Sequence, residues 1–224
     1  MTERHKIVVF DLDDTLYKEI DFLKSAYRYI AGVMSNESVS EDKIFQLLWN
    51  TYKEGGNAFE TVVEKYGGLT FSVDWMLNTY RQHKPHISLG KDIAMFLKRL
   101  NDDGVILGII SDGRFGQQMN KVDALGLKKY IGEDDIIINT DAGHVKPDMR
   151  SFKHFMDKYG DDCAYWYVGD NTSKDFIAPN SLGWTTVCLL DDGQNIHKQN
   201  FLVETWALPD IKVKKMSELI KEII

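Results

Sequence analysis

The sequence predicts an α/β fold, in which a doubly wound, Rossmann-like parallel sheet carries an inserted α-helical subdomain. Short apolar runs rich in Val and Ile alternate with helical patterns near the N-terminus and through the second half of the chain. One stretch between them shows helical periodicity and no strand pattern. With 224 residues, 43% of them hydrophobic, the chain is long enough for one such domain and an insertion.

The apolar runs are expected to form parallel strands that are buried on both faces. A helix is expected over 91–100, where apolar residues recur at helical spacing, and Pro147 is typical of the first turn of another helix. The five expected strands cover residues 7–10, 105–110, 136–138, 165–168 and 185–190.

Residues 17–86 form the predicted insertion, which leaves 1–16 and 87–224 for the sheet domain. Four amphipathic patterns in the insertion predict four helices, with a turn at 54–57 between the second and the third. Aromatic side chains in these patterns are expected to pack against one another. The first apolar stripe consists of Phe22, Ala26, Tyr29, Ile30 and Val33.

Charge and composition argue against several classes of protein. The formal net charge is -7 and no block of like charges occurs, so neither a nucleic-acid nor a membrane partner is expected. No apolar run is long enough for a signal peptide or a membrane span, which makes the cytoplasm the expected compartment. Cys163 and Cys188 lie in or beside apolar stretches and are expected to be buried thiols. Monomer and homodimer remain equally open.

Polar side chains follow the expected strands at the point where each one ends. Asp11 and Asp13 follow the first strand, Ser111 the second, Lys146 lies in the loop after the third, and Asp170 follows the fourth. Ligands of parallel α/β sheets bind at this edge. Mg²⁺ prefers oxygen ligands and would relieve the repulsion among the carboxylates, so we expect a magnesium site there.

This set of side chains suits the transfer of a phosphoryl group. Asp11 can attack phosphorus and form an aspartyl-phosphate, while the metal and Lys146 keep Asp11 ionised. Asp13 can act as general acid and base if its proton is shared within the carboxylate cluster. Ser111 can hold phosphoryl oxygens. Asp112 beside it is expected to contact the phosphate, to support the site from behind or to face solvent.

The motifs DLDDT, IISDG, VKP and GDNTSKD occur in this order at the strand ends. Together they resemble the haloacid dehalogenase-like (HAD) hydrolase superfamily, in its phosphatase branch, over nearly the whole chain. The resemblance implies that residues 17–86 are a mobile cap that closes over the site. It also implies these roles: Asp11 as nucleophile and metal ligand, Asp13 as acid and base and as metal ligand through its backbone carbonyl, Ser111 and Lys146 as phosphate binders, Asp170 as metal ligand, Asp175 as an orienting carboxylate, and Asn171 as its supporting neighbour.

The expected activity is therefore Mg²⁺-dependent hydrolysis of a small phosphorylated metabolite. A sugar-phosphate mutase of the same superfamily, or a phosphate-binding regulatory module without turnover, remains an alternative. A dehalogenase is disfavoured, because halide leaves without a proton and does not need Asp13.

Other side chains have weaker signals. Candidates for substrate selection are Tyr17, Lys53 and Asn57, and Arg114 is a candidate for phosphate binding or for an exposed position. Asp14 is expected to support the site or to face solvent. The histidines that lack metal-ligand spacing, and are therefore expected at the surface or in loops, are His83, His86, His144 and His154.

Overall fold

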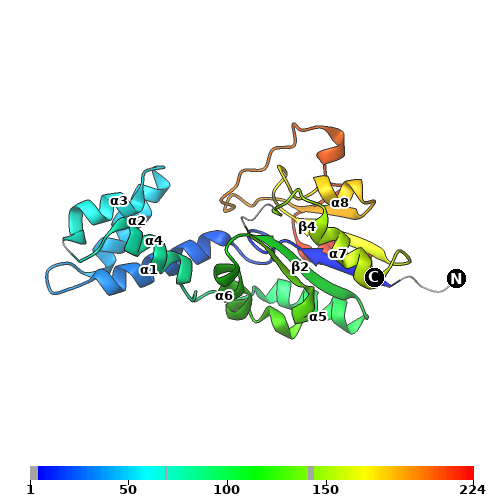
Figure 1. The fold of residues 1–224 in the computed structure, drawn as a ribbon, viewed down its shortest axis with the longest axis horizontal. Helices are drawn as coiled ribbons and strands as arrows, with labels where there is room; N and C mark the ends of the chain where they lie inside the picture. The colour runs from blue at the N-terminus through cyan, green and yellow to red at the C-terminus, as the bar shows by residue number, and fades with distance from the viewer. Residues whose placement is uncertain (1–4, 69, 141–143) are drawn as a thin grey trace.

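Six parallel strands form one sheet in the larger part of the molecule (Figure 1). The computed structural model describes residues 5–68, 70–140 and 144–224. The strand order is β3-β2-β1-β4-β5-β6, which confirms the predicted doubly wound sheet. The strands are β1 (Lys6–Phe10), β2 (Ile106–Asp112), β3 (Ile136–Asn139), β4 (Ala164–Gly169), β5 (Thr185–Leu189) and β6 (Ile211–Val213).

Each of the five predicted strands is present, and β6 is additional. Only three residues long, β6 pairs with β5 at the edge of the sheet through Val187 and Ile211 and the two pairs that follow. So short a run has no detectable periodicity, which is why the sequence pattern missed it.

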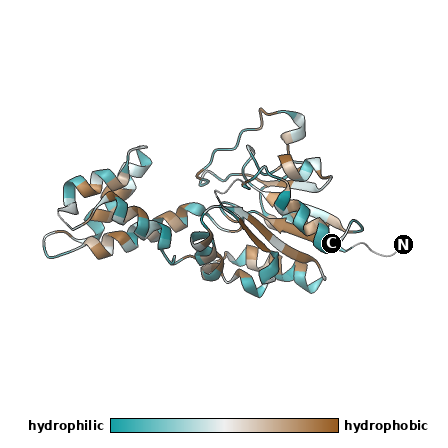
Figure 2. Cartoon of the chain, in the orientation of Figure 1, coloured by the Kyte–Doolittle hydropathy of each residue, from teal (hydrophilic) through white to brown (hydrophobic). Residues whose placement is uncertain are grey.

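Helices cover both faces of the sheet, because alternate residues of each strand point to opposite sides. Val8 and Phe10 of β1 pack with α5, α6 and α9 on one face, whereas Ile7 and Val9 pack with α7 and α8 on the other. Figure 2 shows the hydrophobic strands between helices whose outer surfaces are hydrophilic. The helices are α5 (Lys91–Asp102), α6 (Phe115–Leu125), α7 (Arg150–Tyr159), α8 (Ile177–Ser181) and α9 (Ile220–Ile223).

Two details differ from expectation. Pro147 does not begin a helix: α7 begins at Arg150, where the Asp148 carboxylate accepts a hydrogen bond from the Arg150 N–H at 2.8 Å. Cys188 is buried as expected, whereas Cys163 is only half-buried, and both are free thiols. None of the helices within the described ranges is long and apolar enough to cross a membrane.

The helical insertion extends away from the sheet and has its own hydrophobic cluster (Figure 1). No named strand occurs among its described residues, as predicted. Tyr29 and Val33 do not join the cluster, however: they are 52% and 46% exposed, although both belong to the predicted apolar stripe. The helices are α1 (Glu19–Met34), α2 (Glu41–Lys53), α3 (Ala58–Val62), continued by a π-helical turn (Val63–Gly67), and α4 (Val73–Gln82).

His83 lies in the loop where α4 leads back toward the sheet domain, which is one of its two expected settings, but it is buried and not at the surface. Its side chain is only 4% exposed and its Nε2 lies 2.8 Å from the Ser25 hydroxyl of α1. The ring packs against Phe22 and Tyr29. Burial, with a smaller contribution from His86, lowers the pKa of His83 to about 4. The histidines His86, His144 and His154 are exposed as expected.

The buried neutral imidazole of His83 should make stability depend on pH. The pKa of His83 is about 4 in the folded state and about 6.5 in the unfolded state. Between these two pH values the unfolded chain binds a proton at His83 and the folded chain does not. The stabilisation is complete above the unfolded pKa and is lost as the pH falls. When the pH falls from about 7 to about 5, proton uptake by His83 in the unfolded chain should lower the free energy of unfolding by about 2 kcal/mol.

Urea unfolding of wild-type protein, His83→Gln and the exposed-site control His154→Gln at both pH values measures this effect. The wild-type protein and the control should lose stability equally on acidification, and His83→Gln should lose less. Equal losses in all three proteins would show that His83 does not titrate as its burial implies.

Candidate active site

Asp11 and Asp170 lie side by side because β1 and β4 are neighbours at the point where the order of strand connections reverses. Phe10 pairs with Val168, and the Asp11 N–H donates to the Val168 carbonyl at 2.8 Å. The residues that follow these two strands therefore emerge together at the carboxyl edge of the sheet. Both carboxylates are almost completely buried.

Lys146 reaches this edge from the loop after β3 and pairs with two carboxylates. Its Nζ is 2.7 Å from Asp11 Oδ1 and 2.8 Å from Asp175 Oδ1, and it donates to the Tyr167 hydroxyl at 2.9 Å. Burial alone would lower the pKa of Lys146, but the carboxylates of Asp11 and Asp175 raise it above its usual value. Lys146 is thus a fixed positive charge beside Asp11.

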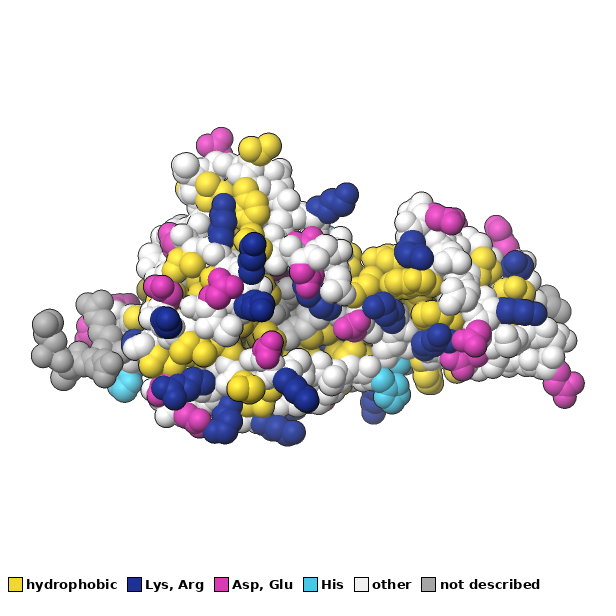
Figure 3. Space-filling view, turned by 180° about the vertical axis from the view of Figure 1, so that it is seen from behind, with side chains coloured by type: hydrophobic (Ala, Val, Ile, Leu, Met, Phe, Trp, Pro, Cys, Tyr) yellow, Lys and Arg dark blue, Asp and Glu magenta, His cyan; other side chains and the backbone are white. Residues whose placement is uncertain are grey.

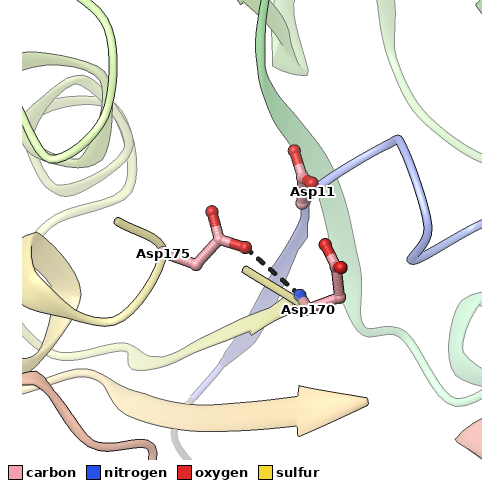
Figure 4. A group of neighbouring side chains, drawn as sticks. All are labelled: Asp11, Asp170 and Asp175. Carbon is pink, nitrogen blue, oxygen red and sulfur yellow. Dashed lines mark hydrogen bonds between the residues drawn. The ribbon is translucent and has the colours of Figure 1, made fainter. Parts of the chain in front are cut away.

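The three carboxylates in Figure 4 are close enough to share a cation. Oxygen atoms of Asp11, Asp170 and Asp175 all lie within 4.8 Å of one another. Burial and the neighbouring carboxylates raise the pKa of Asp11 to about 7, against the attraction of Lys146, and that of Asp170 to about 9. Both carboxylates offer hard oxygen donors, and both need a nearby positive charge in order to ionise. These two properties fit Mg²⁺.

Asp175 holds the other groups in place. Its Oδ2 accepts from the backbone N–H groups of Asp170 at 3.2 Å and Asn171 at 2.8 Å, and its Oδ1 pairs with Lys146. A Cβ on Gly169 would lie 2.5 Å from Asp175 Oδ2, so only glycine permits this approach. Asp11 and Asp170 therefore keep the free oxygens, and Asp175 orients them.

The surroundings of Asp13 differ from the expected shared proton. Its carboxylate accepts from Lys121 Nζ at 2.7 Å, from Gln118 Nε2 at 2.8 Å and from the Tyr17 hydroxyl. Although burial raises the pKa of Asp13, Lys121 and the other donors lower it below the usual value. These donors keep Asp13 ionised, so it has no proton to share with Asp11 and Asp170.

Ser111 lies at the end of β2 and is buried. Its oxygen accepts from Gln118 Nε2 at 2.7 Å, which leaves the hydroxyl hydrogen available for an acceptor in the site. Ser111 is thus able to donate to a phosphoryl oxygen.

Asp112 has three donors of its own. Its carboxylate accepts from Asn139 Nδ2 and from the backbone N–H of Lys146, each at 3.0 Å, and from Lys174 Nζ at 2.8 Å. Because these donors occupy both oxygens, Asp112 positions Lys146 and Lys174 instead of offering a free group to phosphate.

Several groups at the site carry no motif signal. Gln118 and Lys121 lie on one face of α6, and burial raises the pKa of Glu19, at the start of α1, to about 8. The side chains around the reactive groups enclose a hollow of about 110 Å³. It is lined by Asp11, Asp13, Asp14, Glu19, Ser111, Asp112, Asp170, Asn171, Lys174 and His197.

Asp14 is buried and has a structural role in place of a solvent-facing one. Its Oδ1 accepts from the Glu19 N–H and its Oδ2 from the Ile196 N–H, each at 2.9 Å. It adopts a φ of 55°, a left-handed conformation that Asp tolerates better than most residues. One carboxylate thus joins the first turn of α1 to the segment after β5.

Of the candidates for substrate selection, the structure brings only Tyr17 to the site. Lys53 is exposed near Trp49, and Asn57 caps α3 by accepting from the Glu60 N–H. Arg114 is exposed and does not line the hollow. A larger groove of about 1120 Å³ runs beside α1, and Tyr17 is one of the residues that line it. Figure 3 shows hydrophobic side chains gathered at the waist between the sheet domain and the helical insertion.

Removal of the negative charge of Asp175 should destabilise the fold. Asp175→Asn deprives the buried Lys146 of one of its two anionic partners, so the free energy of unfolding should fall by about 3 kcal/mol. Urea unfolding in the presence of chelator measures the loss without a contribution from bound metal.

Asp102→Asn is the matched control, because it breaks the exposed pair with Lys98 and should cost less than about 1 kcal/mol. A loss for Asp175→Asn as small as that of this control would show that the buried pair does not support the fold.

The chain is similar in sequence to known proteins. The profile of the haloacid dehalogenase-like hydrolase family matches residues 8–189. A protein of Methanocaldococcus jannaschii named glyceraldehyde 3-phosphate phosphatase is 28% identical over 199 residues, which are 83% of this chain and 85% of that protein. A protein of the same name from Methanothermobacter thermautotrophicus is 24% identical and covers 94% of this chain and 98% of its own length.

Solved structures share the fold at lower identity. YfnB from Bacillus subtilis, solved bound to magnesium, is 19% identical with a TM-score of 0.67 and 99% coverage of both chains. A HAD phosphatase from Thermococcus onnurineus is 20% identical with a TM-score of 0.57 and 97% coverage of both. With the family profile spanning both the first and the last motif of the site, the chain belongs to the haloacid dehalogenase-like hydrolases.

Proposed function

We propose that this protein is a Mg²⁺-dependent phosphatase that hydrolyses a small phosphate monoester through an aspartyl-phosphate on Asp11. The observation that carries the proposal is the pairing of Asp11 with Lys146 at 2.7 Å, next to the Asp170 carboxylate. A nucleophile, a cation for the phosphoryl group and a second metal ligand thereby share one hollow. The chain is a phosphoric monoester hydrolase of this family. Its metal, its intermediate and its substrate are what we propose.

Glyceraldehyde 3-phosphate is the first candidate substrate, because both reported relatives are named as phosphatases of this compound. The hollow has a volume of about 110 Å³, which suits a substrate with a small leaving group. Residues 17–86, the proposed cap, would then move toward the proposed core of 1–16 and 87–224. Tyr17, Glu19 and His197 are the side chains near Asp13 that could meet the leaving group.

The residues that would hold Mg²⁺ are Asp11 and Asp170 through their carboxylates and Asp13 through its backbone carbonyl. Bound there, the ion would supply positive charge to the phosphoryl oxygens. Lys146 would add to that charge, and Ser111 would donate a hydrogen bond to a phosphoryl oxygen.

In the first step, a carboxylate oxygen of Asp11 attacks phosphorus and the bond from phosphorus to the ester oxygen breaks. Asp13 gives its proton to the leaving alkoxide. In the second step, water attacks the aspartyl-phosphate, loses a proton to Asp13 and releases inorganic phosphate and free Asp11.

The donors around Asp13 suit the second step, which needs an ionised base. For the first step, Asp13 must take up a proton from solvent water when substrate binds. The phosphate dianion brings negative charge beside the carboxylate and so favours its neutral form. Lys121 therefore sets the charge of Asp13 before substrate arrives, and the substrate alters it.

Purified protein should release inorganic phosphate from glyceraldehyde 3-phosphate with Mg²⁺, and chelator should stop the release. Asp11→Asn should lower kcat by at least about 10⁴-fold, because the nucleophile is lost. A phosphate-release assay measures both effects, with the exposed-site variant Asp92→Asn as the matched control.

Turnover without metal, or an active Asp11→Asn variant of normal fold, would disprove the mechanism. A phosphorylated isomer as product, without free phosphate, would instead identify a mutase. Substrate binding without any turnover would identify a regulatory module.

Asp13→Asn should leave the attack by Asp11 possible but remove the base of the second step. The variant should therefore accumulate phosphoenzyme, formed at least about a hundredfold more slowly than in the wild-type protein. Acid quenching followed by mass spectrometry detects a mass gain on Asp11. Steady turnover at the wild-type rate would show that another group transfers the proton.

A further inference from the structure

The segment 191–200, which follows β5, contacts the proposed metal ligand Asp170 from two sides. Asn195 Nδ2 donates to Asp170 Oδ2 at 2.8 Å, and Gln199 Nε2 donates to the Asp170 backbone carbonyl at 2.9 Å. The Asn200 N–H also donates to the buried Thr172 hydroxyl at 2.9 Å. The turn that carries Asp170 is thus held by a segment outside the recognised motifs.

Asn195 has a partner at each end of its carboxamide. Its Oδ1 accepts from Lys18 Nζ at 2.9 Å, while Lys18 also pairs with Asp192 at 2.8 Å. The partners fix the orientation of the amide, because the reverse would place oxygen against the Asp170 carboxylate and NH₂ against the ammonium group. Asparagine therefore matches this position, where a second carboxylate would repel Asp170.

Lys18 connects this contact to the helical insertion. It is the residue immediately before α1, and the backbone N–H of Glu19, the first residue of α1, donates to Asp14. Asp14 also accepts from Ile196, next to Asn195. The start of α1 and the segment 191–200 are therefore joined twice, once through Lys18 and once through Asp14.

Resting on the proposed function, we propose that Asn195 is a positioning residue that holds one oxygen of Asp170 so that the other is directed to Mg²⁺. Lys18 in turn holds Asn195, so Mg²⁺ affinity depends on the placement of α1. Without the contact, the Asp170 carboxylate can rotate, and the bound ion loses a ligand held in one orientation.

Isothermal titration calorimetry with Mg²⁺, without substrate, on the wild-type protein and its variants tests the proposal. Asn195→Ala should raise the dissociation constant of Mg²⁺ at least about tenfold, and Lys18→Met at least about threefold. Asn200→Ala is the control for the first variant, because its carboxamide oxygen accepts from the Leu202 N–H instead of touching Asp170. Lys24→Met is the control for the second, since Lys24 pairs with Asp21 on the exposed side of α1.

The dependence of kcat on Mg²⁺ gives a second readout. Asn195→Ala should recover most of the wild-type kcat at saturating Mg²⁺, because positioning changes affinity and not the chemical step. A Mg²⁺ dissociation constant within twofold of wild type in folded Asn195→Ala would overturn the proposal, as would a low kcat that Mg²⁺ does not restore. Circular dichroism establishes folding.

Where Asn195→Ala does not fold, Lys18→Met decides, and an unchanged Mg²⁺ affinity in it overturns the proposal. A wild-type protein that binds no Mg²⁺ would refute the proposed function. Normal binding and turnover by the wild-type protein, with no effect of either variant, would refute the role of Asn195 alone.

Discussion

The ammonium group of Lys146, buried between Asp11 and Asp175, is the interaction on which the rest of the site depends. An isolated buried charge would be costly, and so would the carboxylates without it. Paired, they place Asp11, the proposed nucleophile, beside a fixed positive charge. Asp175 extends this arrangement to the backbone of Asp170 and Asn171, so one network sets the positions of residues from the ends of β1 and β4 and from the loop after β3.

This network leaves a surplus of negative charge. Lys146 satisfies part of the charge of Asp11 and Asp175, while among the described residues the Asp170 carboxylate accepts a hydrogen bond from the neutral Asn195 amide on one oxygen. The raised pKa values of Asp11 and Asp170 express that imbalance. A divalent cation would correct it at the place where a phosphoryl group would also need positive charge. The proposed binding of metal and of phosphate would then be parts of one electrostatic balance.

The sequence was sufficient to predict the sheet and the convergence of Asp11, Ser111, Lys146 and Asp170 at its edge, because strand periodicity and parallel order determine both. It was insufficient for the donors of Asp13, since Lys121 is 108 residues away and only packing of α6 brings it there. The burial of His83 was missed for a similar reason, because it depends on Ser25 of α1. Local pattern cannot report contacts that tertiary packing creates.

The double link of Asp14 has a consequence for the order in which the protein assembles during synthesis. Helices α1–α4 can gather around their own hydrophobic cluster as soon as they leave the ribosome. The first turn of α1 cannot complete its contacts until residues 192–196 have been made. The partners of Lys18 are Asp192 and Asn195, and Asp14 accepts from the Ile196 N–H. The helical insertion is therefore built early, whereas its attachment to the segment 191–200 forms only near the end of translation.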